Sequence, residues 1–187
     1  MVAIMKKGKI FVVSGPSGAG KTTLVKMLKE KYKNVYLSIS ATTRPPRLND
    51  LEAKDYYFLN QEEFVSKIEN DEFLEYAKVH DNFYGTLKKR VMAQLDLGEI
   101  VLLEIDIQGG FQVKEKILDT VLIFITTSKK QLQNRLEKRG TDSGATITKR
   151  LKNGCVEKKK SKDYDHIILN DDIENALKKL EEIIVGG

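Results

Sequence analysis

The chain has one cysteine, no tryptophan, three prolines and two histidines among its 187 residues. The single cysteine, Cys155, excludes an internal disulfide, and no cysteines and histidines stand at the spacing of a zinc site, so apolar packing must stabilise the fold. Long hydrophobic runs are also missing, and Lys6 and Lys7 interrupt the apolar N-terminal residues. We therefore expect a cytoplasmic protein with no membrane partner.

Neither sign of charge dominates the composition. The 32 lysines and arginines stand against 27 aspartates and glutamates, which gives a net charge of +5, and 41% of the residues are hydrophobic. Such a mixture is typical of a folded soluble domain rather than of a disordered chain. At roughly 150 residues per domain, the length predicts one domain with a sizeable core.

The positive excess is confined to residues 129–162. This segment has twelve lysines and arginines and three acidic residues, a net charge of +9, so the rest of the chain has a net charge of −4. It contains no aromatic residue, although nucleic-acid binding usually adds aromatic side chains for stacking, so we expect no nucleic-acid partner. The charge alone is compatible with a solvated helical face or with a cover over a polyanionic ligand such as a nucleoside triphosphate.

Short β-branched runs alternate with helical patterns along the chain. Nearly continuous apolar runs predict strands buried on both faces at residues 10–13, 100–105, 121–125 and 167–169. Helices are predicted at residues 22–32, 87–97, 129–138, 147–159 and 173–184, and the last of them follows an N-cap signal at residues 170–172. This alternation predicts an α/β fold around a parallel sheet.

Aromatic residues gather in the first half of the chain. Eight of the fourteen phenylalanines and tyrosines lie between Tyr56 and Tyr84. We interpret residues from about 35 to 90 as a small lobe with a core of its own, in which tyrosines can also present hydroxyl groups to a ligand. Residues 43–50 include Pro45 and Pro46 and are predicted to form a loop.

Residues 15–22, GPSGAGKT, match the phosphate-binding pattern G-x-x-x-x-G-K-[ST] between a predicted strand and a predicted helix. Small residues let successive backbone N–H groups surround phosphate oxygens at the positive end of the helix. Lys21 then neutralises the β- and γ-phosphates, and the Thr22 hydroxyl ligates the Mg²⁺ that bridges them. The residues expected to bind ATP here are Gly15, Pro16, Ser17, Gly18, Ala19, Gly20, Lys21, Thr22 and Thr23.

GTPases, motor ATPases and small-molecule kinases all use this loop, so other residues must distinguish them. Asp106 follows the predicted strand at 100–105 and is compatible with the D-x-x-G switch of a GTPase or with the carboxylate end of a second strand at the phosphate site. A GTPase also needs a later N/T-K-x-D guanine motif, and the chain has none. A kinase needs a second anion site, for which Arg44 and Arg47 in the proline-stiffened loop are candidates.

Eight motifs in order make the sequence resemble the guanylate kinases. They are GPSGAGKTTL at 15–24, SISATTRPPR at 38–47, KDYYF at 54–58, EFLEYA at 72–77, NFYGT at 82–86, LEIDIQG at 103–109, RLEKRG at 135–140 and LNDD at 169–172. The resemblance implies a P-loop kinase fold, with a parallel sheet flanked by helices, a small GMP-binding lobe and a mobile lid. It also implies transfer of the γ-phosphoryl group from Mg·ATP to GMP or dGMP, which gives ADP and GDP.

The resemblance further implies the residues of the site. Those implied on the GMP side are Ser40, Glu75 and Thr86 at the guanine, Arg44, Arg47, Tyr56 and Tyr84 at the phosphate, and Asp106 near the Mg²⁺ or the sugar and base of GMP. Asn170 is implied near the adenine of ATP. The implied catalytic residues are Lys21, Arg44, Arg135, Arg139 and Arg150. The choice of Glu75 is chemically sensible, because a carboxylate accepts from both N1–H and the amino group of guanine, whereas adenine presents an acceptor at N1.

The same resemblance divides the chain into a nucleotide core (1–34, 87–128 and 163–187), a GMP-binding lobe (about 35–86) and a lid (about 129–162). A non-catalytic guanylate-kinase-like binding module and a related P-loop kinase with another acceptor stay open as alternatives. Both a monomer and a homodimer are compatible with the sequence. Family members commonly have glycine where Ala53 stands, so if that position has a positive φ we expect either mild strain at Ala53 or a different turn.

Overall fold

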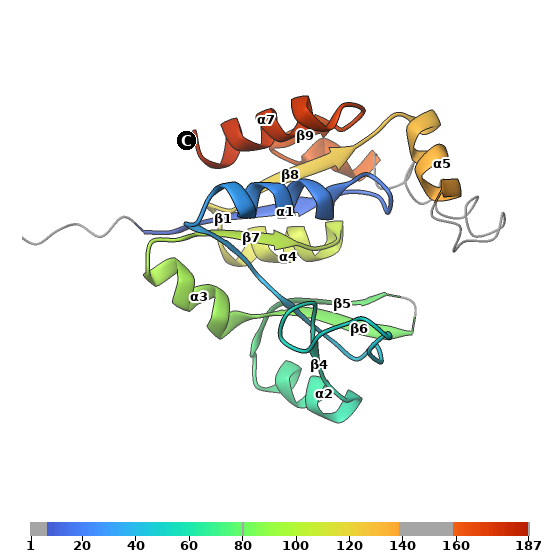
Figure 1. Cartoon of the computed structure of the whole chain (residues 1–187). Coiled ribbons are helices and arrows are strands. Elements are labelled where there is room, and N and C mark those ends of the chain that lie inside the picture. The colour runs from blue at the N-terminus through green and yellow to red at the C-terminus, as the bar shows by residue number, and fades with distance from the viewer. Residues whose placement is uncertain (1–6, 80, 139–158, 187) are drawn as a thin grey trace, which may run out of the picture.

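Two sheets organise the residues that the computed structural model describes, which are 7–79, 81–138 and 159–186 (Figure 1). The larger sheet has five parallel strands in the order β2-β7-β1-β8-β9. Its strands are β1 (Lys9–Ser14), β2 (Val35–Leu37), β7 (Ile100–Glu104), β8 (Val121–Thr126) and β9 (His166–Leu169). Four of these were predicted from their buried apolar runs, so the predicted α/β fold around a parallel sheet is confirmed.

Alternate residues of each strand pack on opposite faces of this sheet, as the period of two requires. Phe11 and Val13 of β1 face one cluster together with Leu24 and Leu180, while Val12 faces the other with Val91. Burial on both faces explains why the strands read as continuous apolar runs.

Five helices of the described residues accompany the large sheet. They are α1 (Lys21–Lys31), α3 (Lys88–Asp96), α4 (Ile107–Lys116), α5 (Lys129–Lys138) and α7 (Ile173–Ile184). Figure 1 shows α1 and α7 on one face of the sheet and α3 and α4 on the other. Asp172 caps α7 by accepting from the Asn175 N–H, as the acidic N-cap signal predicted. None of the helices in the described ranges is long and apolar enough to cross a membrane.

The helix predictions agree with the structure except at three places. Helix α2 (Gln61–Glu69) was not predicted. Helix α4 was not predicted, because Gly109 and Gly110 lie in its first turn and glycine is a poor helix former. Of the helix predicted at 147–159, residues 147–158 lie outside the described residues.

The smaller sheet has four strands in the order β4-β3-β6-β5. They are β3 (Ser40–Thr42), β4 (Tyr57–Phe58), β5 (Phe73–Val79) and β6 (Asn82–Leu87). Helix α2 (Gln61–Glu69) packs on it through Phe64, whose ring stacks 4.4 Å from that of Phe73 and 5.4 Å from that of Phe83, measured between centroids. These phenylalanines form the core that the aromatic cluster predicted.

One predicted boundary is wrong. The small lobe was expected to begin near residue 35, but β2 pairs with β7 in the large sheet through Val35 and Ile100. The physical reason is that Val35 is buried in the main core beside α1, so this short strand completes the edge of the large sheet before the chain leaves it. The small sheet starts at Ser40, and the chain returns to the large sheet through α3.

Candidate active site

Residues 15–20 form the turn between β1 and α1 at the carboxyl edge of the large sheet. Gly15 (φ 145°) and Gly20 (φ 90°) adopt a backbone conformation that favours glycine. A Cβ atom at Gly15 would overlap the carbonyl oxygen of Ile125 on β8, so the turn runs directly against the sheet. The first N–H groups of α1 have no acceptor within the helix, and with the helix dipole they favour an anion at this end.

Lys21 and Thr22, the first two residues of α1, place a cation and a hydroxyl at this turn. The Lys21 ammonium donates to the carbonyl oxygens of Gly15 and, at 3.1 Å, of Pro16, so it lies over the loop. The Thr22 Oγ1 donates to Glu104 Oε1 at 2.6 Å. Hydroxyl and carboxylate oxygens are ligands of the kind that Mg²⁺ prefers.

Glu104 was not among the predicted site residues. It is the last residue of β7, and its carboxylate reaches Thr22 across the carboxyl edge of the sheet. A carboxylate at the end of a buried strand, two residues before Asp106, is the signal that would have identified it. The prediction considered only Asp106 at this place.

Ser40, Thr86 and Glu75 form one row across three neighbouring strands. Ser40 on β3 pairs with Thr86 on β6, and Thr86 pairs with Glu75 on β5. Directly paired residues of antiparallel strands point to the same face. The structure therefore brings together the three residues that the resemblance implied at the guanine.

Glu75 has an unusual electrostatic environment. Only 4% of its surface is exposed, and burial raises its pKa to about 7. The hydrogen bond from Thr86 Oγ1 to Glu75 Oε1, at 2.6 Å, opposes this rise, and the negative charge of Asp106 adds to it. A buried carboxyl whose ionisation is costly is typical of a functional site, because a ligand donor can compensate the charge.

Asp106 is the N-cap of α4. Its Oδ1 accepts from the Gly109 N–H at 2.8 Å, and the residue also lines the cavity described below. Its carboxylate therefore has a structural partner in addition to any ligand.

The loop between β3 and β4 holds Arg44 beside two tyrosines. The Arg44 guanidinium lies 5.2 Å from the centroid of the Tyr56 ring, and Tyr56 and Tyr84 meet edge to face at 6.0 Å. Arg44 Nη2 also bonds Asp50 Oδ2 at 2.7 Å. The Arg47 backbone N–H and the Arg44 guanidinium hold the pKa of Asp50 below its ordinary value. Neither arginine lines the cavity described below, and the Arg47 side chain is exposed, so only the ring contact groups Arg44, but not Arg47, with the tyrosines.

The expected strain at Ala53 is present. Ala53 has φ 57°, in the left-handed region that glycine adopts without cost, and its N–H donates to the Tyr56 carbonyl oxygen at 2.8 Å. The turn that leads to Tyr56 thus keeps its shape with alanine.

Arg135 and Asn170 lie against the other side of the phosphate loop. Arg135 donates to the carbonyl oxygens of Ala19 (3.2 Å) and Asn170 (2.8 Å), and Asn170 Nδ2 donates to Ala19 as well, at 2.7 Å. The buried Asn170 Oδ1 has no hydrogen-bond partner within the described ranges. Arg139 and Arg150, the other two arginines implied in the basic segment, lie outside the described residues.

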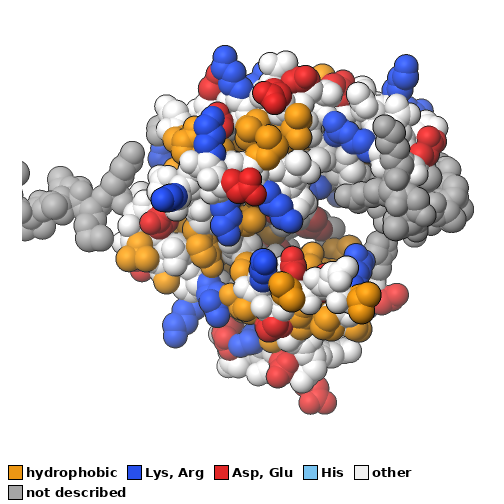
Figure 2. Space-filling model, viewed as in Figure 1, with side chains coloured by type: hydrophobic (Ala, Val, Ile, Leu, Met, Phe, Trp, Pro, Cys, Tyr) orange, Lys and Arg blue, Asp and Glu red, His pale blue; other side chains and the backbone are white. Residues whose placement is uncertain are grey.

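The phosphate loop and the row on the small sheet open into one cavity of about 410 Å³. It is lined by Gly15, Ser17, Lys21, Ser40, Tyr56, Glu75, Ala77, Val79, Tyr84, Glu104, Ile105 and Asp106. Figure 2 shows the molecule hollowed between the large sheet with its helices and the small lobe below. A cation over an anion-binding turn therefore faces a buried carboxylate across a single open cavity.

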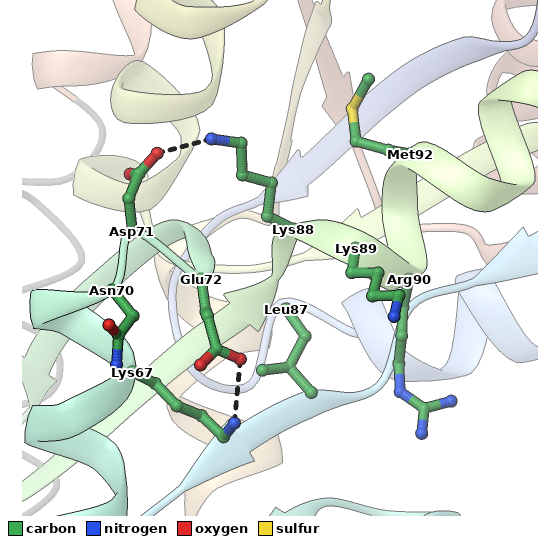
Figure 3. Close-up of a pocket in the computed structure, with 9 residues that line it drawn as sticks. All are labelled: Lys67, Asn70, Asp71, Glu72, Leu87, Lys88, Lys89, Arg90 and Met92. Atoms are coloured by element: carbon green, nitrogen blue, oxygen red, sulfur yellow. Dashed lines mark hydrogen bonds and ion pairs between the residues drawn. The ribbon is translucent and has the colours of Figure 1, made fainter.

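A larger cavity, of about 730 Å³, lies where α2 and the start of β5 meet α3 (Figure 3). Both of its carboxylates are already paired, because Lys88 bonds Asp71 at 2.6 Å and Lys67 bonds Glu72 at 2.9 Å. It includes no residue of the phosphate loop. We therefore place the candidate active site in the smaller cavity.

Comparisons with known proteins agree with this geometry. The family model described as guanylate kinase matches residues 7–186. A guanylate kinase of Fusobacterium nucleatum is 51% identical over 98% of this chain and 99% of its own length, and one of Caldanaerobacter subterraneus is 48% identical over 99% and 90%. The crystal structure of guanylate kinase from Anaplasma phagocytophilum superposes with a TM-score of 0.78 at 35% identity, covering 97% of this chain and 86% of that one.

Proposed function

The chain belongs to the guanylate kinase family, and on that premise we propose that it transfers the γ-phosphoryl group of Mg·ATP to GMP, giving ADP and GDP. It is an enzyme of the nucleoside monophosphate kinase class. The observation that supports this proposal best is the shared cavity, in which Lys21 of the phosphate loop and the buried Glu75 face the same space.

The acceptor base is read by the row of Ser40, Thr86 and Glu75. Guanine presents N1–H and an exocyclic amino group side by side, and the two oxygens of an ionised Glu75 accept from both. Adenine presents an acceptor at N1, so AMP would leave the buried carboxylate unpaired. A site built in this way rejects the analogue that lacks the donors by a large factor.

The acceptor phosphate lies toward the loop at the mouth of the cavity. Arg44 supplies the charge, and its guanidinium lies 5.2 Å from the centroid of the ring of Tyr56, which lines the cavity. The Tyr56 and Tyr84 hydroxyls add donors. Arg47 reaches this phosphate only if the exposed loop folds inward, so its role depends on closure of the small lobe.

The donor triphosphate occupies the phosphate loop, with Lys21 at its β- and γ-phosphates. The Thr22 hydroxyl and the Glu104 carboxylate are oxygen donors 2.6 Å apart and fit the Mg²⁺ that accompanies ATP. When bound, the ion neutralises charge on the phosphates. The buried Asn170 Oδ1 is an acceptor suited to the exocyclic amino group of adenine.

Phosphoryl transfer needs positioning and neutralisation of charge rather than a general base, because the acceptor phosphate is already ionised. Arg135 already contacts the phosphate loop, and Arg139 and Arg150 belong to the same basic segment. We assign this segment, residues 129–162, as a lid that brings arginines to the migrating phosphoryl group. Closure of the lid and the small lobe would exclude water, so that the phosphoryl group goes to GMP.

A steady-state assay with Mg·ATP and GMP, dGMP, AMP, UMP or CMP as separate acceptors tests the proposal. We expect GDP formation to fall by at least about a hundredfold in Lys21→Ala. The preference for GMP over AMP should narrow by at least about a hundredfold in Glu75→Gln. Lys26→Ala on the exposed face of α1 and Glu72→Gln before β5 are matched controls.

The two alternatives predict different results. A non-catalytic binding module would bind GMP without turnover of any acceptor, and a related kinase would phosphorylate another acceptor faster than GMP. Either result would overturn the proposal. The intact Lys21 and Thr22 favour the enzyme over the module, because a module has no need of a phosphate-binding lysine.

A further inference from the structure

One face of α4 runs along the outer edge of β5, which is an edge strand of the small sheet. The Gln112 side-chain amide bonds both backbone groups of Tyr76: its Oε1 accepts from the Tyr76 N–H at 3.1 Å, and its Nε2 donates to the Tyr76 carbonyl at 3.0 Å. One turn further along the helix, Lys116 donates to the Phe73 carbonyl oxygen at 3.3 Å. Gln112 thus takes the place of a neighbouring strand at this point of the edge.

The same helix face also touches the carboxylate of Glu75, the residue before Tyr76. A Cβ atom at Gly109 would overlap Glu75 Oε2, so the helix approaches the carboxylate as closely as a glycine allows. Gly109 and Gln112 are three residues apart and therefore lie on one side of the helix. This side of α4 therefore contacts both the backbone of β5, at Tyr76, and the carboxylate of Glu75.

Helix α4 also connects to the phosphate loop. It begins at its N-cap Asp106, two residues after Glu104, and Glu104 bonds Thr22 at 2.6 Å. Figure 1 shows α4 on the face of the large sheet that is turned toward β5. A short path of hydrogen bonds and one helix therefore joins the phosphate loop to the base-reading carboxylate.

We propose that Gln112 is a positioning residue that holds the Glu75 carboxylate at a set distance from the phosphate loop, and that Gly109 admits the carboxylate to that position. This inference rests on the proposed function, in which Glu75 reads guanine. It assigns to α4 the alignment of the acceptor base with the donor phosphates. Neither residue touches the reacting atoms.

Kinetics with two acceptors test this role. Inosine monophosphate lacks the exocyclic amino group of GMP, so the ratio of kcat/KM for the two acceptors reports where the Glu75 carboxylate lies. In Gln112→Ala we expect kcat/KM for GMP to fall between about tenfold and a hundredfold, as a misplaced group commonly causes. The preference for GMP over inosine monophosphate should shrink at least about threefold, while the KM for ATP changes less than about twofold.

Two further pairs of variants separate positioning from stability. Gln112→Met keeps the length of the side chain without its hydrogen bonds and should behave like Gln112→Ala, while Gln94→Ala on α3 is the matched control. Gly109→Ala should shrink the acceptor preference as well. Gly110→Ala introduces the same methyl group one residue later, where it would meet the Tyr164 hydroxyl instead, and should leave the preference unchanged.

The outcomes distinguish this inference from the proposed function. If the wild-type protein forms no GDP, or if Glu75→Gln keeps the full preference for GMP, the proposed function fails. If both of those results are as expected but Gln112→Ala and Gln112→Met keep the acceptor ratio of the wild type, only the positioning role is wrong. A ratio that shrinks equally in Gly109→Ala and Gly110→Ala would also overturn it.

Discussion

Replacing Glu75 by glutamine should stabilise the ligand-free protein while it removes base recognition. The folded protein raises the pKa of Glu75 from an ordinary value of 4.5 to about 7, chiefly through burial. Because the folded value is the higher one, the neutral acid favours the folded state, and this contribution is lost as the pH rises through 7. Glutamine has no charge to bury and can still accept from the Thr86 hydroxyl.

The size of the effect follows from the two pKa values. At about 1.4 kcal/mol for each pH unit between them, Glu75 lowers the free energy of unfolding, relative to an uncharged side chain, by about 3 kcal/mol near pH 8.5 and by about 1 kcal/mol at pH 5. A protein of this length changes its melting temperature by about 2–4 °C per kcal/mol. We therefore expect Glu75→Gln to melt roughly 6–12 °C above the wild type at pH 8.5, and only a few degrees above it at pH 5.

Urea and thermal unfolding of both proteins at the two pH values, without nucleotide, measure this difference. The two proteins share all other titrating groups. The difference between their free energies of unfolding should therefore change between pH 5 and pH 8.5 only because of Glu75. Glu72→Gln makes the same chemical change in an exposed side chain and is the control. An equal stability difference at pH 5 and pH 8.5 would refute the reasoning, since it would mean that water reaches the carboxylate. The same ionisation should make GMP bind more weakly as the pH falls below 7.

Three other substitutions test the framework around the site. Phe64→Ala removes the ring that stacks on Phe73 and should cost about 3–5 kcal/mol in urea unfolding, whereas a loss below about 1 kcal/mol would contradict the packed core. Tyr164→Phe removes the buried hydroxyl that donates to Ser14 at 2.8 Å and should cost about 1 kcal/mol in thermal unfolding. At Ala53, with φ 57°, a β-branched valine should cost about 1–3 kcal/mol by calorimetry, while glycine should be neutral or stabilising.

The large sheet was predictable because its strands are buried on both faces. Continuous apolar runs marked β1, β7, β8 and β9, and the periodic segments between them marked four helices. The strand β2 has three residues, too few to show a period, and its place in the large sheet depends on pairing with β7. Contacts between distant segments, rather than local preference, decide where such a strand belongs.

The site could be predicted in identity but not in arrangement. Motifs named Ser40, Thr86 and Glu75, yet only the strand register shows that they form one row. The pairing of Thr22 with Glu104 joins residues 82 positions apart, so only the fold shows it, although the end of a buried strand marks Glu104 as a candidate. The raised pKa of Glu75 likewise arises from burial, which a sequence does not display.

Helix α4 shows why local preference and function disagree at this site. Gly109 and Gly110 lower the preference of the segment for a helix, each by about 1 kcal/mol relative to alanine, and this is why the helix was missed. The same missing side chain lets the helix backbone approach the Glu75 carboxylate, where a methyl group at Gly109 would overlap Oε2. Places where a sequence contradicts its own local structure are often functional sites. Gly109 and Gly110 at the start of α4 therefore indicate that another group packs closely against the helix backbone, and in this structure that group is the Glu75 carboxylate.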